Sequence, residues 1–206
     1  MVENSYIDEG YIKFNCRKLA ETIPNHNKLD ELIKWRRAVY LKNWIGYDEK
    51  HQVGFGNISI SDEQGFIISG TQTGHLENLQ PEHFTSIVSY NILENSVECI
   101  GPLNASSETM THAVIYENDR SQINAVIHIH NKSIWEKLMW KIPTTGEDVP
   151  YGTPEMAQEI HRLFREERLG EKKILAMAGH EDGIIAFGKS LEEAASILNE
   201  FEKAKF

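Results

Sequence analysis

An apolar run that ends in two histidines constrains the fold of this chain most strongly. Residues 123–130 read Ile-Asn-Ala-Val-Ile-His-Ile-His, which indicates a β-strand. Residues two apart on a strand point to the same face of a sheet, so His128 and His130 can present both imidazoles to one point. Imidazole nitrogen is a common metal ligand. The pattern therefore predicts half of a metal site at the end of this strand.

Composition limits the classes of protein that the chain can belong to. Its 206 residues suit a single domain, expected over 1–206, and its net charge of −10 disfavours nucleic acid as a partner. No apolar run approaches the ~20 residues of a membrane-spanning helix, so no membrane role is expected. The acidic start lacks the apolar core of a signal peptide, and Cys16 and Cys99 make no disulfide framework. We expect a cytoplasmic protein.

The elements before the His-x-His strand alternate irregularly between helices and strands. We predict helices over residues 13–22 and 27–44, with Asn27 capping the second and its lysines and arginines on a solvated face. A strand with two glycines at 53–60 then pairs with a strand at 66–69 as a hairpin. A short helix at 81–88 and a strand at 96–100 follow.

The elements after this region complete the pattern. A helix begins near Ser106 or Ser107, and another covers residues 132–140, where a cupin would need a strand. Thr153 and Pro154 cap the next helix, strands at 173–178 and 183–187 form a hairpin, and Ser190 opens the last helix. Strands in hairpins and between helices indicate an α+β fold, a three-layer α/β/α domain with a mostly antiparallel sheet covered by helices.

Several polar residues near these elements allow two interpretations. Glu108 lies in the first turn of its helix, where an acidic residue stabilises the helix dipole or serves chemistry. His112 is one turn further and is interpreted as an inward-packed, hydrogen-bonded histidine rather than a chelator. His180 lies between Gly179 and the turn of a hairpin, with little to pack against, and is predicted to be a third ligand.

Five motifs occur in an order that resembles the class II aldolase/adducin family, whose members include fuculose-phosphate aldolase and ribulose-phosphate 4-epimerase. They are Gly56-Asn57-Ile58-Ser59, Thr73-Gly74, Ser106-Ser107-Glu108, His128-x-His130 and Gly179-His180. The resemblance implies that His128, His130 and His180 hold Zn²⁺ or another divalent metal. It implies that Glu108 is the catalytic acid/base beside the metal. It also implies that Gly56, Asn57, Thr73, Gly74, Ser106 and Ser107 cradle a substrate phosphate. Main-chain N–H groups, hydroxyls and a helix N-terminus suit such an anion.

The resemblance carries expectations about assembly and reaction. Family members form fourfold-symmetric homotetramers with a nine-stranded antiparallel sheet and sites at subunit interfaces. The implied activity is that of a lyase that cleaves or forms a C–C bond in a small sugar phosphate through a zinc-stabilised enediolate. The same metal site also suits epimerase, dehydratase or decarboxylase chemistry on a related substrate. A non-catalytic, adducin-like module is the third interpretation, which the complete set of histidines disfavours.

The sequence departs from the family pattern at the expected positions of tyrosines. The link between His130 and the helix at Pro154 is short, whereas the aldolases carry a longer stretch there with a catalytic tyrosine. The chain ends at Phe206, where relatives continue into a tail that supplies another tyrosine. Tyr151 is the candidate replacement as proton donor. Ser61 stands where many relatives have Arg or Lys.

Overall fold

The fold is built on one twisted sheet of eight strands. The computed structural model describes residues 10–63 and 65–203. The strand order is β1-β7-β6-β5-β4-β8-β10-β9, and every neighbouring pair is antiparallel except β1 and β7. The bounds are β1 (Asn15–Ala20), β4 (Asn57–Ser61), β5 (Phe66–Ser69), β6 (Phe84–Asn91), β7 (Ser96–Ile100), β8 (Ala125–His130), β9 (Ile174–Ala176) and β10 (Gly183–Gly188). A separate ribbon pairs β2 (Gly46–Asp48) with β3 (Val53–Phe55).

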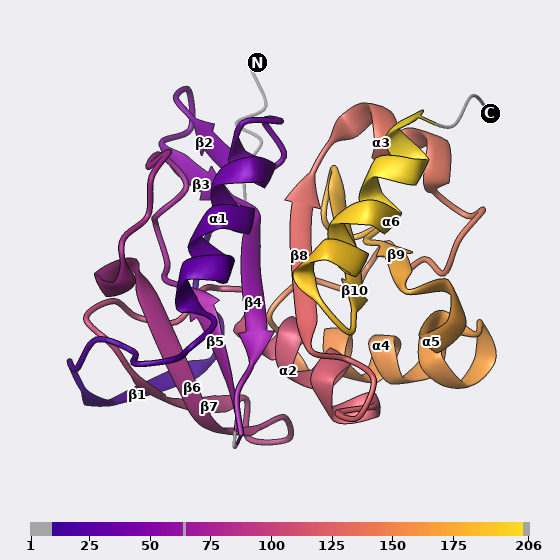
Figure 1. Cartoon of the computed structure of the whole chain (residues 1–206). Helices are drawn as coiled ribbons and strands as arrows, with labels where there is room; N and C mark the ends of the chain where they lie inside the picture. The colour runs from indigo at the N-terminus through magenta and orange to yellow at the C-terminus, as the bar shows by residue number, and fades with distance from the viewer. Residues whose placement is uncertain (1–9, 64, 204–206) are drawn as a thin grey trace, which may run out of the picture.

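Helices cover both faces of the sheet (Figure 1). One apolar core joins the sheet to α1 (Leu29–Tyr40), α3 (Lys132–Leu138) and α6 (Leu191–Lys203). A second core joins the other face to α2 (Thr109–Asn118), α4 (Pro154–Glu166) and the short α5 (Leu169–Lys172). A single 3₁₀ turn, η1 (Pro81–His83), precedes β6. The predicted α+β class with three α/β/α layers and a mostly antiparallel sheet is confirmed.

The central strand β8 explains how an apolar run can also build a polar site. Ile127 and Ile129 are fully buried in the core beneath α1 and α6, whereas Val126 packs on the opposite face with α2 and α4. Burial on both faces requires apolar residues at successive positions, which is the pattern seen in the sequence. Because side chains alternate between the faces, His128 and His130 extend from β8 on the side of α2 and α4.

Two predicted helices are strands instead. Residues 13–22 contain β1, an edge strand that pairs parallel to β7 and alternates between exposed and half-buried side chains. A short, half-buried edge strand has no apolar face strong enough to reveal its period of two. In residues 81–88, only η1 is helical, and β6 begins at Phe84. The β-branched residues Thr85, Ile87 and Val88 favour that strand.

Other boundaries differ less. The predicted strand over residues 53–60 is broken at Gly56, which has φ +72° and separates β3 from β4. Asn27 does not cap α1, because Lys28 occupies the N-cap position without a side-chain cap bond. The predicted hairpin of β4 and β5 is confirmed. The side chains of Thr153 and Ser190 accept backbone N–H groups at the starts of α4 and α6, as predicted.

The described residues include no helix with the length and apolar composition required to cross a bilayer. The two cysteines are reduced, and their Sγ atoms lie 3.4 Å apart between β1 and β7.

Candidate metal and substrate site

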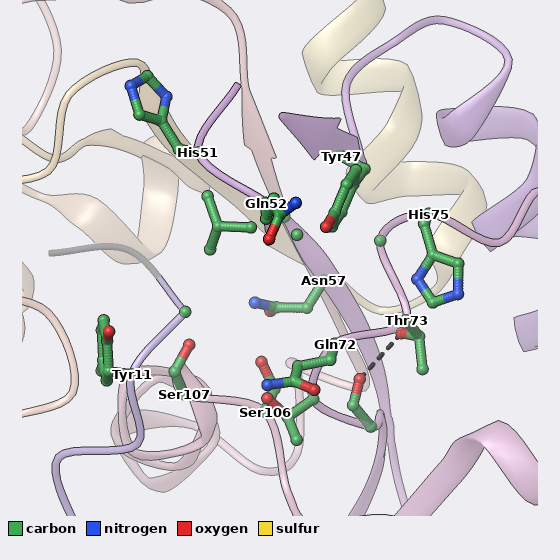
Figure 2. A pocket seen from close by; sticks show the side chains of 17 residues that line it. Tyr11, Tyr47, His51, Gln52, Asn57, Gln72, Thr73, His75, Ser106 and Ser107 are labelled. Atoms are coloured by element: carbon green, nitrogen blue, oxygen red, sulfur yellow. Dashed lines mark hydrogen bonds between the residues drawn. The ribbon is translucent and has the colours of Figure 1, made fainter. Parts of the chain in front are cut away.

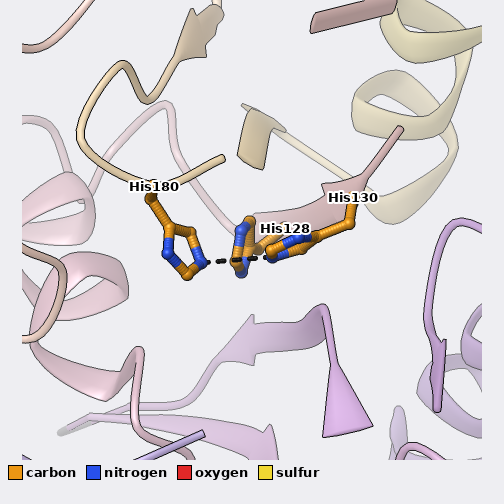
Figure 3. Close-up of side chains that lie close together, drawn as sticks. All are labelled: His128, His130 and His180. Atoms are coloured by element: carbon orange, nitrogen blue, oxygen red, sulfur yellow. Dashed lines mark hydrogen bonds between the residues drawn. The ribbon is translucent and has the colours of Figure 1, made fainter. Parts of the chain in front are cut away.

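Three histidines converge at the end of β8 (Figure 3). His128 and His130 come from the strand, and His180 comes from the turn that joins β9 to β10. One ring nitrogen of each lies within 4.8 Å of those of the other two. The Nε2 atoms of His130 and His180 are 3.1 Å apart. Two nitrogens bound to one tetrahedral zinc ion lie about 3.3 Å apart, so the donor set fits a metal of this kind.

The protonation of these histidines also suits metal binding. Burial lowers the pKa of His130 to about 4. Burial, followed by the neighbouring imidazoles, lowers the pKa values of His128 and His180 well below the ordinary value. All three rings are therefore neutral at pH 7 and keep a lone pair for a cation. The buried Nε2 of His128 has no hydrogen-bond partner among the described residues, as expected for an atom placed to ligate.

Backbone geometry brings the three rings together. A β-carbon at Gly183 would lie 2.8 Å from Cδ2 of His180 and 3.4 Å from Nε2 of His128. Only glycine leaves room for both imidazoles at this position. The turn itself is held by the N–H of Gly183, which donates to the carbonyl of His180 at 2.9 Å.

Glu108 lies beside this cluster at the N-cap of α2. Its Oε1 is 3.5 Å from Nε2 of His180, and its side chain is almost fully buried. Burial raises the pKa of the Glu108 carboxyl to about 7. A carboxyl with a pKa near neutrality can both accept and donate a proton, which is the property required of an acid/base.

Asn57, Ser59 and His112 are buried polar residues close to the histidine cluster. Asn57 is paired with His128 across β4 and β8, and its Nδ2 is 3.4 Å from Nδ1 of that histidine. Ser59 Oγ is 2.7 Å from Nδ1 of His112 and 2.8 Å from the hydroxyl of Tyr116. His112 is fully buried, so it is the inward-packed, hydrogen-bonded residue that the sequence predicted.

A pocket of about 400 Å³ opens beside the histidine cluster (Figure 2). All six residues predicted to bind substrate line it: Gly56, Asn57, Thr73, Gly74, Ser106 and Ser107. Its volume is within the range of small-molecule sites. Among the residues that the structure describes, the lining consists of glycine backbone, hydroxyls, amides, imidazoles, phenols and the side chain of Val53, and it includes no Lys, Arg, Asp or Glu. The structure thus brings the predicted substrate residues together in one cavity next to the predicted ligands.

Tyr151 packs against His180. The two ring centroids are 4.6 Å apart, and the Tyr151 hydroxyl accepts the backbone N–H of Tyr11 at 3.1 Å. The ring is 2% exposed. Tyr151 is therefore close to the predicted ligands, and its hydroxyl is held in place by the segment that precedes β1.

Sequence reasoning missed residues that shape the pocket. Arg36 was placed on a solvated face of α1, but its side chain is buried at 1% exposure. Residues 70–74 form a loop of sequence GTQTG. The Arg36 guanidinium donates to the carbonyls of Thr73 and Gly74 at the end of this loop, and to those of Leu76 and Glu77 just after it. The sequence of an amphipathic helix does not distinguish a buried arginine from an exposed one. The difference lies in the loop carbonyls that accept hydrogen bonds from the buried arginine in the folded protein.

The polar wall of the pocket was also missed. Tyr11, Tyr47, Gln52, Gln72 and His75 line it, and none of them is a residue of the five motifs (Figure 2). Gln72 was within reach of sequence reasoning, since it lies inside the GTQTG loop. The others are brought to the cavity by the β2–β3 ribbon, by the loop after Gly74 and by the N-terminal segment.

The family of the chain follows from its sequence as well as from this geometry. Residues 31–205 match the class II aldolase and adducin N-terminal domain. The protein belongs to this family. No match was found among curated proteins.

Solved structures with the same fold include sugar-phosphate aldolases. L-fuculose-1-phosphate aldolase from Thermus thermophilus shares 18% identity and a TM-score of 0.60, over 84% of this chain and 88% of that one. A further L-fuculose 1-phosphate aldolase shares 21% identity and a TM-score of 0.63, over 87% and 84%. YgbL from Klebsiella pneumoniae, for which aldolase, epimerase and decarboxylase activities are the candidates, shares 16% identity and a TM-score of 0.61, over 84% of each chain. At these identities the likeness shows the fold.

Proposed function

We propose that the protein is a divalent-metal-dependent lyase of the class II aldolase type that acts on a small sugar phosphate. The observation that carries the proposal is the set of three neutral imidazoles beside a buried carboxyl, at the edge of a polar pocket. Membership of the aldolase and adducin family supports it. The complete ligand set disfavours a non-catalytic, adducin-like role.

In this proposal His128, His130 and His180 hold the metal. Zinc is the ion that three nitrogen ligands and an open fourth position suit best. When bound, a divalent ion supplies Lewis-acid polarisation of a substrate oxygen. The chain's contribution is to keep the imidazoles neutral through burial and to fix their orientation, with the Asn57 side chain adjacent to Nδ1 of His128.

Glu108 and Tyr151 are the proton-transfer groups. The Glu108 carboxyl, 3.5 Å from the His180 ring, removes a proton from the substrate carbon or oxygen and returns it in the reverse direction. The Tyr151 phenol, whose ring packs against His180, serves as the proton donor, and the N–H of Tyr11 fixes its oxygen. Both groups are buried, so proton transfer occurs away from bulk water.

The pocket binds the remainder of the substrate. Gly56, Gly74 and the Ser106–Ser107 turn at the start of α2 contribute backbone N–H groups and hydroxyls, while Thr73 Oγ1 donates to the carbonyl of Gly70 at 2.9 Å and so stabilises its loop. Such groups bind a phosphate by hydrogen bonding rather than by ion pairing. Epimerase, dehydratase and decarboxylase chemistry would use the same metal site.

The test is a panel of ketose phosphates assayed with the zinc-loaded wild type and with Glu108→Gln. The aldolase proposal expects triose products from at least one substrate. Loss of the acid/base should slow turnover by roughly 10²–10⁴-fold, whereas a residue that only stabilises the helix would cost ~0.3–1 kcal/mol of stability and leave turnover unchanged.

Glutamine is nearly isosteric with glutamate, so melting temperature and zinc content serve as the controls. An isomerised substrate or released CO₂ in place of a triose would assign one of the alternative reactions. Turnover of Glu108→Gln within a few-fold of wild type would contradict the role of Glu108.

A further inference from the structure

The charges around the site are unevenly distributed. Within residues 10–63 and 65–203, the pocket lining holds no Lys, Arg, Asp or Glu, and the acid/base candidate Glu108 is itself an anion in its active form. A substrate with a negatively charged group that approaches the histidine cluster therefore meets repulsion from Glu108 at short range. Sites that bind anions next to a carboxylate need a compensating cation.

Lys13 supplies a cation at this position. Its Nζ lies 3.9 Å from the centroid of the Tyr151 ring, which in turn packs against His180. Among the described residues, it is the lysine whose charge acts on both Glu108 and His180. Lys13 precedes residue 31, where the match to the family begins, so it does not belong to the family's motifs.

The backbone holds Lys13 in place independently of its side chain. The carbonyl of Lys13 accepts a hydrogen bond of 2.8 Å from Nδ2 of Asn95, and the N–H of Asn15 donates to the carbonyl of Asn95 at 2.8 Å. Two residues before Lys13, the backbone N–H of Tyr11 donates a hydrogen bond to the Tyr151 hydroxyl. A β-carbon at Gly152 would lie 2.8 Å from the carbonyl of Ser107 and 3.9 Å from Cβ of Lys13. The stem of Lys13 thus lies near Gly152, the residue that follows Tyr151.

We propose that Lys13 is a substrate-binding residue whose ammonium pairs with an anionic group of the substrate, a carboxylate or a phosphate, beside His180 and Tyr151. The segment that precedes β1 is then part of the site rather than only an edge of the sheet. The inference rests on the proposed function in requiring a small anionic substrate, but it concerns binding and not turnover.

The test measures anion binding to the zinc-loaded protein by isothermal titration calorimetry, with glycolate as the carboxylate probe and inorganic phosphate as the phosphate probe. Lys13→Met removes the charge and keeps the main-chain bond to Asn95. The substitution should reduce the affinity for at least one of the two anions by about ten- to hundredfold, the contribution expected of a charge-assisted hydrogen bond. The anion whose affinity decreases identifies the group that Lys13 binds.

Two control variants separate this role from a general effect of charge. Lys13→Arg keeps the cation and should bind both probes within about threefold of wild type. Lys42→Met is the matched control, because Lys42 also lies over an aromatic ring, 4.2 Å from the centroid of Trp44, but pairs with Glu202 on the opposite face of the sheet. It should bind both probes as wild type does.

The proposal is overturned if Lys13→Met binds both anions like wild type, if Lys42→Met loses as much affinity as Lys13→Met, or if the wild type binds neither anion. Zinc content and circular dichroism melting curves are recorded for every variant. If the wild type turns over no ketose phosphate but binds an anion in a way that requires Lys13, the proposed reaction alone is contradicted. If the wild type is active but Lys13→Met binds both anions as tightly as wild type, this inference alone is contradicted.

Discussion

His112 shows how burial of one residue couples stability to pH. Burial lowers its pKa to about 3, and its Nδ1 contacts Ser59 Oγ at 2.7 Å. Burial also raises the pKa of the Tyr116 phenol, so Tyr116 keeps its proton, and its hydroxyl lies 2.8 Å from Ser59 Oγ, where either oxygen can donate. Nε2 of His112 is buried and has no hydrogen-bond partner among the described residues, so the fold offers no acceptor that would stabilise a charged imidazolium.

The sign of the pH effect follows from the two protonation equilibria. In the unfolded chain His112 binds a proton below about pH 6.5, whereas in the folded protein it stays neutral down to about pH 3. The unfolded state thus binds more protons in this window, and the free energy of unfolding decreases as the pH falls. When the pH falls from 7 to 5, the titration of His112 should lower the free energy of unfolding by about 2 kcal/mol.

Urea unfolding of the metal-free protein at both pH values measures the effect. His112→Gln cannot titrate, so its free energy of unfolding should fall by about 2 kcal/mol less than that of wild type over this interval. Equal pH dependence of the two proteins would mean that His112 is accessible to protons in the folded state.

At the scale of elements, the contact between α1 and the loop after β5 positions the pocket. Arg36 donates to carbonyls of this loop from a fully buried position, and burial lowers its pKa to about 10. Arg36→Met should cost about 2–4 kcal/mol of stability, because buried carbonyls lose their donors. The neighbouring Arg37 is half-exposed and pairs with Glu77, so Arg37→Met should cost less than ~1 kcal/mol. Chemical denaturation of the two variants measures both; equal costs would refute the structural role of Arg36.

The elements that sequence reasoning found and missed differ in how their residues are buried. β8 and the hairpin of β4 and β5 were predictable, because buried strands concentrate apolar residues in short runs. The edge strand β1 was not, because pairing with β7 rather than its own composition makes it a strand. Within the site, the two-residue spacing of His128 and His130 and the glycine beside His180 indicated the three histidines. The roles of Lys13 and Arg36 depend on contacts with residues distant in the chain, which the sequence does not reveal.

At the scale of the whole molecule, we expect a homotetramer, as is typical of the family. Repeated heterologous contacts that close as a ring would produce fourfold symmetry. Exposed apolar side chains such as Leu93 and Trp140 are available for such contacts. Light scattering at micromolar concentration should give the mass of four chains. A monomer of 23.6 kDa would contradict this expectation and would restrict Tyr151 to the site of its own chain.

The most direct test of the central claim is the metal content of the purified protein and of two histidine variants. Three neutral imidazoles within 4.8 Å of one another should bind about one divalent ion per chain, zinc by ligand type. His128→Ala should lose the ion, whereas His112→Ala, which removes a buried histidine outside the ligand set, should retain it. Elemental analysis of wild type without metal, or of His128→Ala with a full complement, would contradict the account.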